Sequence, residues 1–358
     1  MPFMTPEETD RYSRQILFPG IGQAGQQRLA AAHAAILGCG ATGAATASLL
    51  ARAGVGTLTL IDRDFVEPSN LQRQILFDEA DALACLPKAE AARRHIALFN
   101  SSVTVHAHIA DLVPANIADL LAPEKNIDLF LDCTDNFETR YLLNDYAVQQ
   151  SKPWIYAAAV GSYAATMNIL PKGPSAPWAL NPTPCLACLF PEPPTGPVET
   201  CDTAGILSTA VNLAASFQVT EALKLLTGQP HLMRRSLLSF DLWTGDRSEI
   251  ATKTPNPDCP VCAHRLFTHL AGTGRPHITL CGRNSVQIHE HHRPIDLPAM
   301  HTRLASHPDV EDLRSNDLLL RFRRGPYSLT LFPDGRALIQ GTTDITQART
   351  LYARFVGS

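Results

Sequence analysis

A glycine-rich stretch near the N-terminus has the spacing of a nucleotide-binding turn. Gly38, Gly40 and Gly43 separate an apolar run, residues 34–37, from an alanine-rich segment, residues 44–54. The first glycine permits a tight turn, the second lets backbone amides approach a phosphate, and the third lets a helix pack close to the strand. The N-terminus of that helix then favours a bound anion. The pattern predicts a strand, a glycine turn and a helix that bind a nucleotide.

An acidic residue completes this unit. Asp62 lies 19 residues after Gly43 and ends a second apolar strand, residues 57–61. A carboxylate at this place can accept hydrogen bonds from ribose hydroxyls. The unit alone predicts a nucleotide and no particular chemistry, so an NAD-dependent oxidoreductase is one possible function.

The loop that follows is richer in phosphate-directed groups than a nicotinamide dinucleotide site requires. Asn70, Arg73 and Gln74 lie within five positions, and Asp64 precedes them. The planar guanidinium of arginine matches phosphate oxygens, and an asparagine amide can bind ribose or phosphate beside it. These residues favour a triphosphate as the ligand.

Lys88 lies where a bound anion would be needed. It follows a proline in the first turn of a predicted helix, residues 87–96. A lysine there opposes the helix dipole unless an anion is present. We therefore expect Lys88 to bind phosphate; the alternative is a solvated side chain.

The next predicted buried strand, residues 127–133, leads into an acidic turn. Ligands of open parallel sheets bind beyond the carboxyl ends of the strands, so Asp132, Asp135 and Asn136 should face the same crevice as Asp62. Asp135 suits Mg²⁺, which is held in such sites by one or two carboxylates and by phosphates. Asp132 is either a second ligand or a cap for the following helix.

Two Cys-x-x-Cys pairs predict a structural zinc site. Cys185 and Cys188 lie in a proline-rich, largely irregular stretch, and 70 residues separate them from Cys259 and Cys262. Four thiolates are the ligand set of a tetrahedral zinc ion. Such a closed site would pin the irregular stretch to the end of the first domain.

Cys201 is a candidate nucleophile. It precedes a predicted long helix, residues 206–227, and a helix N-terminus lowers the pKa of a nearby thiol. The alternative is an accessible but dispensable thiol.

Taken in order, these motifs identify a family resemblance over about residues 5–265. The chain resembles the E1-like adenylyltransferases, which activate sulfur-carrier proteins for thiamine and molybdenum-cofactor synthesis and include the ubiquitin-activating enzymes. Besides the glycine turn and the cysteine pairs, the resemblance rests on four motifs: Arg11-Tyr12-Ser13-Arg14-Gln15, Ser69-Asn70-Leu71-Gln72-Arg73-Gln74, Pro87-Lys88 and Asp132-Cys133-Thr134-Asp135-Asn136.

The resemblance implies a reaction and its partners. ATP would adenylate the C-terminal glycine carboxylate of a small β-grasp carrier protein ending in Gly-Gly, with Mg²⁺ as cofactor and Zn²⁺ as a structural ion. Arg14 would reach across a homodimer interface to the γ-phosphate bound by the neighbouring subunit, unless it is simply solvated. Arg73 and Lys88 would bind phosphates, and Cys201 would link covalently to the carrier. Sulfur would come from another protein.

Within this family, activation of a thiamine sulfur carrier is the first expectation. Activation of the molybdopterin-synthase carrier and ubiquitin-like conjugation are the alternatives. From other classes, an oxidoreductase or a non-catalytic scaffold with the same fold remain candidates.

The elements that must position these residues form a doubly wound α/β fold. We expect a Rossmann-like, mainly parallel sheet with an antiparallel extension from strands at residues 154–160, 163–170, 236–242 and 249–253. Residues 1–270 should form the adenylation domain, with the zinc site near its end. Residues 277–358 should form a small α+β domain of unassigned role after a linker at residues 270–276.

Composition limits the classes of partner. The chain has 358 residues, of which 45% are hydrophobic and 18% charged, with a net charge of −4. This charge argues against a nucleic-acid-binding surface. Because no signal peptide and no apolar run of membrane-spanning length is found, we expect a cytoplasmic protein without a membrane partner.

Overall fold

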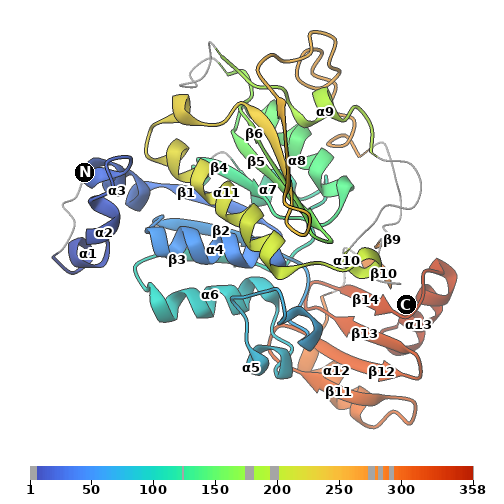
Figure 1. The fold of residues 1–358 in the computed structure, drawn as a ribbon. Coiled ribbons are helices and arrows are strands. Elements are labelled where there is room, and N and C mark those ends of the chain that lie inside the picture. Colours follow the sequence, from blue (N-terminus) through green and yellow to red (C-terminus); the bar gives the residue numbers. More distant parts are fainter. Residues whose placement is uncertain are drawn as a thin grey trace. The chain divides into compact units, whose positions relative to one another are not determined.

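The chain divides into two compact units, Met1–Thr273 and Gly274–Ser358, each with its own sheet (Figure 1). The structure is a computed structural model that describes residues 6–122, 125–173, 181–193, 201–272, 279–280, 285–289 and 294–357. Within these ranges, no helix is long and apolar enough to cross a membrane.

An eight-stranded sheet forms the centre of the first unit, in the order β3-β2-β1-β4-β5-β6-β7-β8. The neighbouring strands β3, β2, β1, β4 and β5 pair in parallel, and β6, β7 and β8 extend the sheet with antiparallel pairs. The predicted mixed α/β sheet is therefore confirmed. The strands are β1 (His33–Leu37), β2 (Thr57–Ile61), β3 (Thr104–His108), β4 (Leu129–Asp132), β5 (Trp154–Val160), β6 (Tyr163–Ile169), β7 (Ser236–Asp241) and β8 (Asp246–Ala251).

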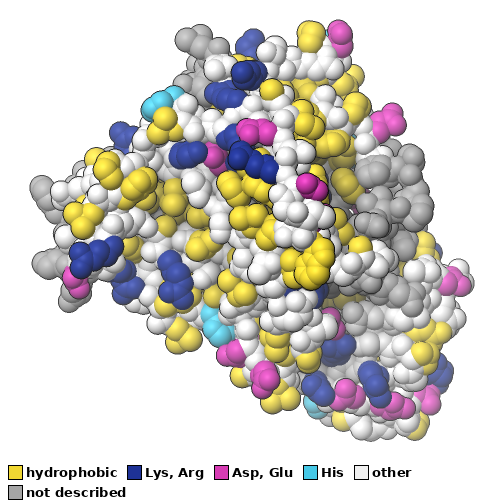
Figure 2. All heavy atoms as spheres, in the orientation of Figure 1, with side chains coloured by type: hydrophobic (Ala, Val, Ile, Leu, Met, Phe, Trp, Pro, Cys, Tyr) yellow, Lys and Arg dark blue, Asp and Glu magenta, His cyan; other side chains and the backbone are white. Residues whose placement is uncertain are grey.

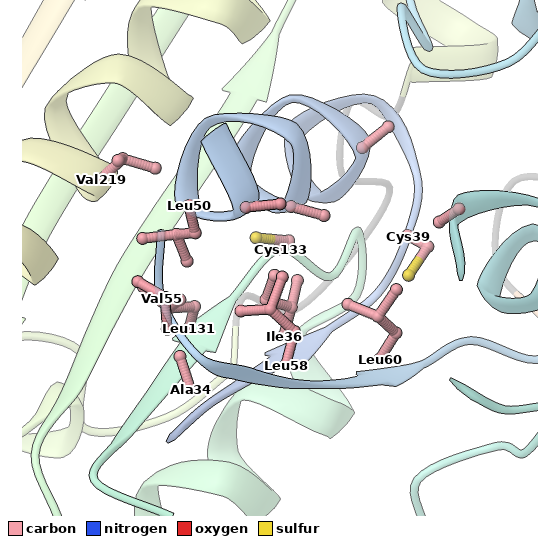
Figure 3. Close-up of a cluster of buried hydrophobic side chains, with 14 of the residues drawn as sticks. Ala34, Ile36, Cys39, Leu50, Val55, Leu58, Leu60, Leu131, Cys133 and Val219 are labelled. Atoms are coloured by element: carbon pink, nitrogen blue, oxygen red, sulfur yellow. The ribbon is translucent and has the colours of Figure 1, made fainter. Parts of the chain in front are cut away.

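Helices cover both faces of this sheet. Along β1, Ala34 and Ile36 join one hydrophobic core, while Ala35 and Leu37 join another, because successive side chains of a strand point to opposite faces. The first core includes α4 (Ala41–Ala53), α6 (Lys88–Phe99) and α11 (Ser208–Leu226), and Figure 3 shows part of it. The second includes α7 (Ile117–Leu120), α8 (Phe137–Gln149) and α9 (Leu186–Leu189).

Short helices make up the rest of the regular structure described in this unit. Three of them precede β1, and the others lie in the connections between strands. They are α1 (Pro6–Arg11), α2 (Ser13–Ile16), α3 (Gly22–Ala31), η1 (Pro68–Asn70), α5 (Glu79–Leu83), α10 (Cys201–Ala204) and η3 (Pro230–Leu232).

Strand β8 starts earlier than predicted. It was expected at residues 249–253 but occupies Asp246–Ala251, because a tight turn with Gly245 at φ +83° brings Asp246 opposite Asp241. Its six residues are all exposed at the edge of the sheet. A charged, exposed strand has no alternating apolar pattern to mark its start.

The second unit is a six-stranded antiparallel sheet in the order β11-β12-β13-β14-β10-β9, with two helices. Phe322, Leu329, Ile339 and Phe355 belong to its core. The elements are β9 (Thr279–Leu280), β10 (Ser285–His289), α12 (Leu297–Ala305), β11 (Glu311–Ser315), β12 (Leu320–Arg324), β13 (Tyr327–Leu331), β14 (Arg336–Gln340) and α13 (Ile345–Phe355). The sequence predicts strands at residues 278–280 and near 318–323, a hairpin turned at residues 333–336, and helices at about residues 297–306 and from about residue 346. It did not predict β10 and β11. Part of the expected linker, residues 273–276, lies outside the described residues.

Candidate active site

The glycine turn after β1 has the conformation that its spacing requires. Gly38 has φ +88°, which favours glycine. A Cβ atom on Gly43 would lie 1.8 Å from the carbonyl oxygen of Gly38, so only glycine lets α4 approach the strand this closely. Gly40, the N-cap of α4, has no atom within 4 Å of an added Cβ. Its backbone is therefore accessible to a ligand.

Asp62 holds the turn and the following loop together. Its side chain is buried, and its Oδ2 accepts a 2.6 Å hydrogen bond from the amide of Cys39. Its Oδ1 accepts a 2.7 Å bond from the amide of Asp64. Burial raises the pKa of the Asp62 carboxyl, and the Lys88 ammonium opposes this effect. Asp62 therefore shapes the crevice in addition to its predicted role toward ribose.

Lys88 is buried against the same loop. Only 2% of its surface is exposed, and its Nζ lies 3.1 Å from Asp64 Oδ2. Its backbone amide also donates to the carbonyl of Asp64 at 2.8 Å. The alternative of a solvated lysine is wrong. The ion pair places a cation at the start of α6, on the side of the crevice formed by the loop after β2.

The loop after β2 contains a second, unpredicted cation. Arg63 donates from Nη1 to both carboxylate oxygens of Asp111 at 2.9 Å. Burial disfavours the charge, but Asp111, Asp64 and Asp135 outweigh burial and raise the pKa of Arg63. The Asp135 carboxylate therefore contributes to the electrostatic environment of Arg63.

Asn70, Arg73 and Gln74, which were predicted to face a triphosphate, differ in their environments. Asn70 is buried, and its Oδ1 accepts from the amide of Glu67 at 3.0 Å, which closes the short helix η1. Arg73 is half-buried and donates from Nη1 to the carbonyl of Ser69 at 2.9 Å. Gln74 is buried, and its Oε1 has no hydrogen-bond partner among the described residues. A buried, unpartnered oxygen suits a site that a ligand completes.

Asp132 and Arg140 form a buried ion pair beneath the acidic turn. Asp132 Oδ2 lies 3.1 Å from Arg140 Nε, and its Oδ1 accepts from the amide and hydroxyl of Thr134. Arg140 also donates to the carbonyl of Thr134 at 2.6 Å. The helix-capping alternative for Asp132 is wrong, because Asn136 is the N-cap of α8 and accepts from the amide of Thr139 at 2.8 Å.

Asp135 is exposed in this turn, at the carboxyl end of β4. The turn that carries it is therefore fixed by the Asp132–Arg140 pair below while its own carboxylate faces outward. Arg140 was missed by sequence reasoning. An arginine in the first turn of the helix after the acidic motif was the available signal.

Arg14 lies on the short helix α2 and is exposed. Two large apolar side chains follow it, Leu17 with 70% and Phe18 with 62% of their surface exposed. Elsewhere, Figure 2 shows basic side chains interspersed with acidic and hydrophobic ones. An exposed cation beside two exposed apolar side chains is compatible with a contact to another subunit.

Cys201 begins a helix, but not the predicted one. It is the first residue of α10, which ends at Ala204, and the long helix α11 begins only at Ser208. Gly205, with φ +72°, separates the two helices. The side chain of Cys201 lies outside the described part of the structure, so its predicted activation is not tested.

The four cysteines of the two pairs converge. Cys185 lies 3.9 Å from Cys188 and 3.6 Å from Cys259, and Cys188 lies 3.4 Å from Cys262, measured between sulfur atoms. Tetrahedral zinc with Zn–S bonds of about 2.3 Å places its sulfur ligands about 3.8 Å apart. All four sulfurs lie within 4.8 Å of one another. The cluster therefore fits a structural zinc ion.

Together, the parallel sheet, the glycine turn with its acid and basic groups, and the four-cysteine cluster define a nucleotide-binding α/β protein with a structural metal site. The family model described as the ThiF family matches residues 12–261. The chain belongs to this family, which confirms the resemblance predicted from its motifs.

Three relatives locate the chain within the family. It is 43% identical over 352 residues to the "Sulfur carrier protein ThiS adenylyltransferase" of Bacillus subtilis, covering 98% of this chain and 100% of that one. It is 36% identical to the "Sulfur carrier protein adenylyltransferase" of Thermus thermophilus, and the match covers 72% of this chain and 92% of that relative. It is 37% identical to the "Adenylyltransferase and sulfurtransferase MOCS3" of Sus scrofa, and the match covers 73% of this chain but only 55% of that relative.

A solved structure supports the fold. MccB of E. coli superposes with a TM-score of 0.61 at 24% identity, covering 71% of this chain and 74% of that one. Membership in the ThiF family also removes the oxidoreductase alternative, which rested on the glycine turn and Asp62 alone.

Proposed function

We propose that this chain adenylates the C-terminal glycine carboxylate of a ThiS-type sulfur carrier protein, with ATP as the other substrate. The observation that carries the proposal is the 43% identity to a ThiS adenylyltransferase over the full length of that relative. The clustering of basic and acidic groups around an accessible glycine turn supports it.

The proposed chemistry is a single displacement at phosphorus. A carboxylate oxygen of the carrier attacks the α-phosphorus of ATP, the bond from that phosphorus to the bridging oxygen breaks, and pyrophosphate leaves. Because the carboxylate is already ionised, no general base is needed. Catalysis then consists mainly of positioning and of neutralising negative charge.

The residues predicted from the sequence have the following parts in this scheme. The backbone at Gly40 and the side chains of Asn70, Arg73 and Lys88 bind phosphates, and Asp62 accepts from the ribose. The remaining assigned residues of the nucleotide site are Gly38, Gly43, Asp64, Gln74, Asp132 and Asn136. Asp64 keeps Lys88 in place before ATP arrives, and their 3.1 Å ion pair supports this role.

Two metal ions belong to the proposal. Asp135 would hold Mg²⁺, which neutralises phosphate charge when bound, and the exposure of this carboxylate at the carboxyl end of β4 suits that role. Cys185, Cys188, Cys259 and Cys262 would hold Zn²⁺ as a structural ion.

The proposed enzyme is a homodimer in which Arg14 of one subunit serves the site of the other. The exposure of Leu17 and Phe18 beside it supports an interface at this helix. Cys201 would act after adenylation, as a covalent attachment point for the carrier, and a separate protein would donate sulfur to the activated carrier.

Carrier-dependent exchange of pyrophosphate into ATP tests the proposal. We expect exchange with a ThiS-type β-grasp protein ending in Gly-Gly and none when its terminal glycine is deleted. Exchange only with the molybdopterin-synthase carrier would instead favour that alternative within the family. If the protein bound ATP but catalysed no exchange with either carrier, the non-catalytic scaffold would be the remaining hypothesis.

A further inference from the structure

Helix α11 carries one buried amide that bonds to the elements of the candidate site. The side chain of Gln218 is fully buried, and its Nε2 donates to the carbonyl oxygens of Asp132 and Ile155, both at 2.9 Å. Its Oε1 accepts from Thr46 Oγ1 at 2.9 Å and from Cys133 Sγ at 3.3 Å. An amide has two donor hydrogens and two acceptor lone pairs, so every bonding position of Gln218 is used.

These four bonds join the elements that carry the site. Thr46 belongs to α4, which starts at the glycine turn. Asp132 is the last residue of β4, and Cys133 follows it just before the turn with Asp135. Ile155 belongs to β5, the next strand of the sheet. One side chain on α11 therefore connects α4, the end of β4 and β5.

The glycine turn itself rests on the backbone that Gln218 holds. A Cβ atom on Gly38 would lie 2.7 Å from the carbonyl oxygen of Cys133, and one on Gly43 would lie 3.3 Å from Cys133 Cβ. Figure 3 shows Cys133 between α4 and the strands that carry Ile36 and Leu131. A shift of Cys133 would consequently move the glycine turn.

We propose that Gln218 is a positioning residue that sets the glycine turn at a fixed distance from the Asp132–Asp135 turn. This inference rests on the proposed adenylation, in which the first turn binds phosphates and the second holds Mg²⁺. In-line attack requires both turns in register, and small misplacements reduce the rate strongly. Glutamate at position 218 would lack the two N–H donors of the amide. An apolar side chain there would leave the carbonyls of Asp132 and Ile155 without a partner.

The substitution Gln218→Met tests the inference because it keeps the length of the side chain and removes its hydrogen bonds. We expect kcat/KM for ATP in pyrophosphate exchange to fall about tenfold to 100-fold and the Kd for ATP to rise, while KM for the carrier stays unchanged. A purely structural role would lower only the Tm.

Asn168→Leu is the matched control. Asn168 is also a fully buried amide, and it donates to Glu221, which lies three residues after Gln218 on α11, and to the carbonyl of Arg234. None of these partners lies at the crevice as assigned above. We expect this variant to lose stability but to keep the wild-type kcat/KM.

Thr46 provides a second arm of the test. Thr46→Val removes the hydroxyl that Gln218 accepts from, whereas Thr46→Ser keeps it. If Gln218 acts through Thr46, Thr46→Val lowers kcat/KM in the wild-type background and adds little to Gln218→Met, and Thr46→Ser has no effect. If Gln218→Met fails to fold, the Thr46 pair carries the test.

The outcomes separate this inference from the proposed function. Wild-type kinetics in a folded Gln218→Met variant would overturn the role of Gln218 and leave the adenylation intact. A wild type that binds ATP without exchange would overturn the adenylation, and the ATP Kd of the variant would then decide on Gln218. A wild type that binds no ATP would overturn both.

Discussion

The cations of the crevice differ in what holds them. Lys88 is buried and paired with Asp64, and Arg140 is buried and paired with Asp132, so their charges are largely balanced within the protein. Arg73 is half-buried and bonded to a main-chain carbonyl. Of these three cations, we infer that Arg73 has the charge least balanced within its own subunit and therefore most available to ATP.

Arg73→Ala should therefore abolish exchange, with a loss of at least about 100-fold, the usual effect of removing one donor to developing charge. Cys201→Ala should leave exchange unchanged, because the thiol is assigned to a later step. The measurement is carrier-dependent exchange of labelled pyrophosphate into ATP. Equal exchange by the two variants would refute the phosphate assignment.

Substitutions at two glycines of the turn should affect different properties, Gly43 the stability of the protein and Gly40 the binding of ATP. An added Cβ on Gly43 collides with the backbone of Gly38, so Gly43→Ala should lower the free energy of unfolding by about 1–3 kcal/mol. Gly40→Ala meets no protein atom, so stability should be kept while ATP binding weakens roughly tenfold, or about 1.4 kcal/mol.

Denaturant unfolding and titration with ATP measure the two effects. If Gly40→Ala left ATP binding unchanged, or weakened it only as much as it lowered stability, the turn would not face the nucleotide.

Local patterns predicted the residues whose role depends on near neighbours. The glycine turn, Asp62 and the placement of Lys88 in the first turn of α6 follow from spacing alone. Arg140 and Gln218 were missed for different reasons. The partners of Arg140, Asp132 and Thr134, are close to it in the sequence, and its place just after the acidic motif was a signal that was not used. Gln218 depends on distant contacts, since it binds a carbonyl 86 positions away. A glutamine inside an apolar helix pattern gives no sign of its partners.

At the scale of elements, the cysteine cluster attaches a short segment to the first unit. Cys185 is the N-cap of α9 and Cys188 lies within it, while Cys259 and Cys262 lie in a turn beyond β8. These segments have little regular structure of their own, so four ligands to one ion would supply cross-links that packing does not.

Removal of zinc should loosen these segments. We expect Cys259→Ser, or treatment of the wild type with a strong chelator, to lower the Tm by roughly 6–12 °C, assuming a loss of about 3 kcal/mol. Zinc content by atomic emission and Tm by calorimetry measure this. Cys85→Ser, at a buried cysteine outside the cluster, is the control and should keep its zinc. A zinc-free protein with unchanged Tm would contradict the structural role.

Two charged edge strands, β8 and β11, were harder to predict than the buried strand β5. β5 (Trp154–Val160) is buried at its start and matches its expected bounds, whereas β8 was misplaced and β11 (Glu311–Ser315) was missed. An edge strand is held by main-chain hydrogen bonds to one neighbour, and those bonds leave no mark on side-chain composition.

At the scale of the whole molecule, the assigned site residues all lie in the first unit. The Thermus relative is matched over 92% of its length by 72% of this chain. The matched length, 262 residues, is shorter than the first unit of this chain. We infer that the second unit is not required by the proposed chemistry.

The proposed homodimer can be tested by complementation. If Arg14 serves the partner's site, mixed dimers of Arg14→Ala and Arg73→Ala subunits contain one intact site. Random mixing then restores about one quarter of wild-type exchange, although each variant alone is inactive. Exchange assays after co-refolding measure this. Mixed dimers without activity would place Arg14 outside the neighbouring site.

The four cysteine sulfurs do not share one environment. Cys185 and Cys259 are buried, while Cys188 and Cys262 are half-buried and 3.4 Å apart. A peroxide entering from solvent would meet this outer pair first, and oxidation there would eject the ion while the inner thiols stayed reduced. Ageing of the purified protein should therefore begin as a local chemical lesion at one edge of the molecule, well before the sheet itself unfolds.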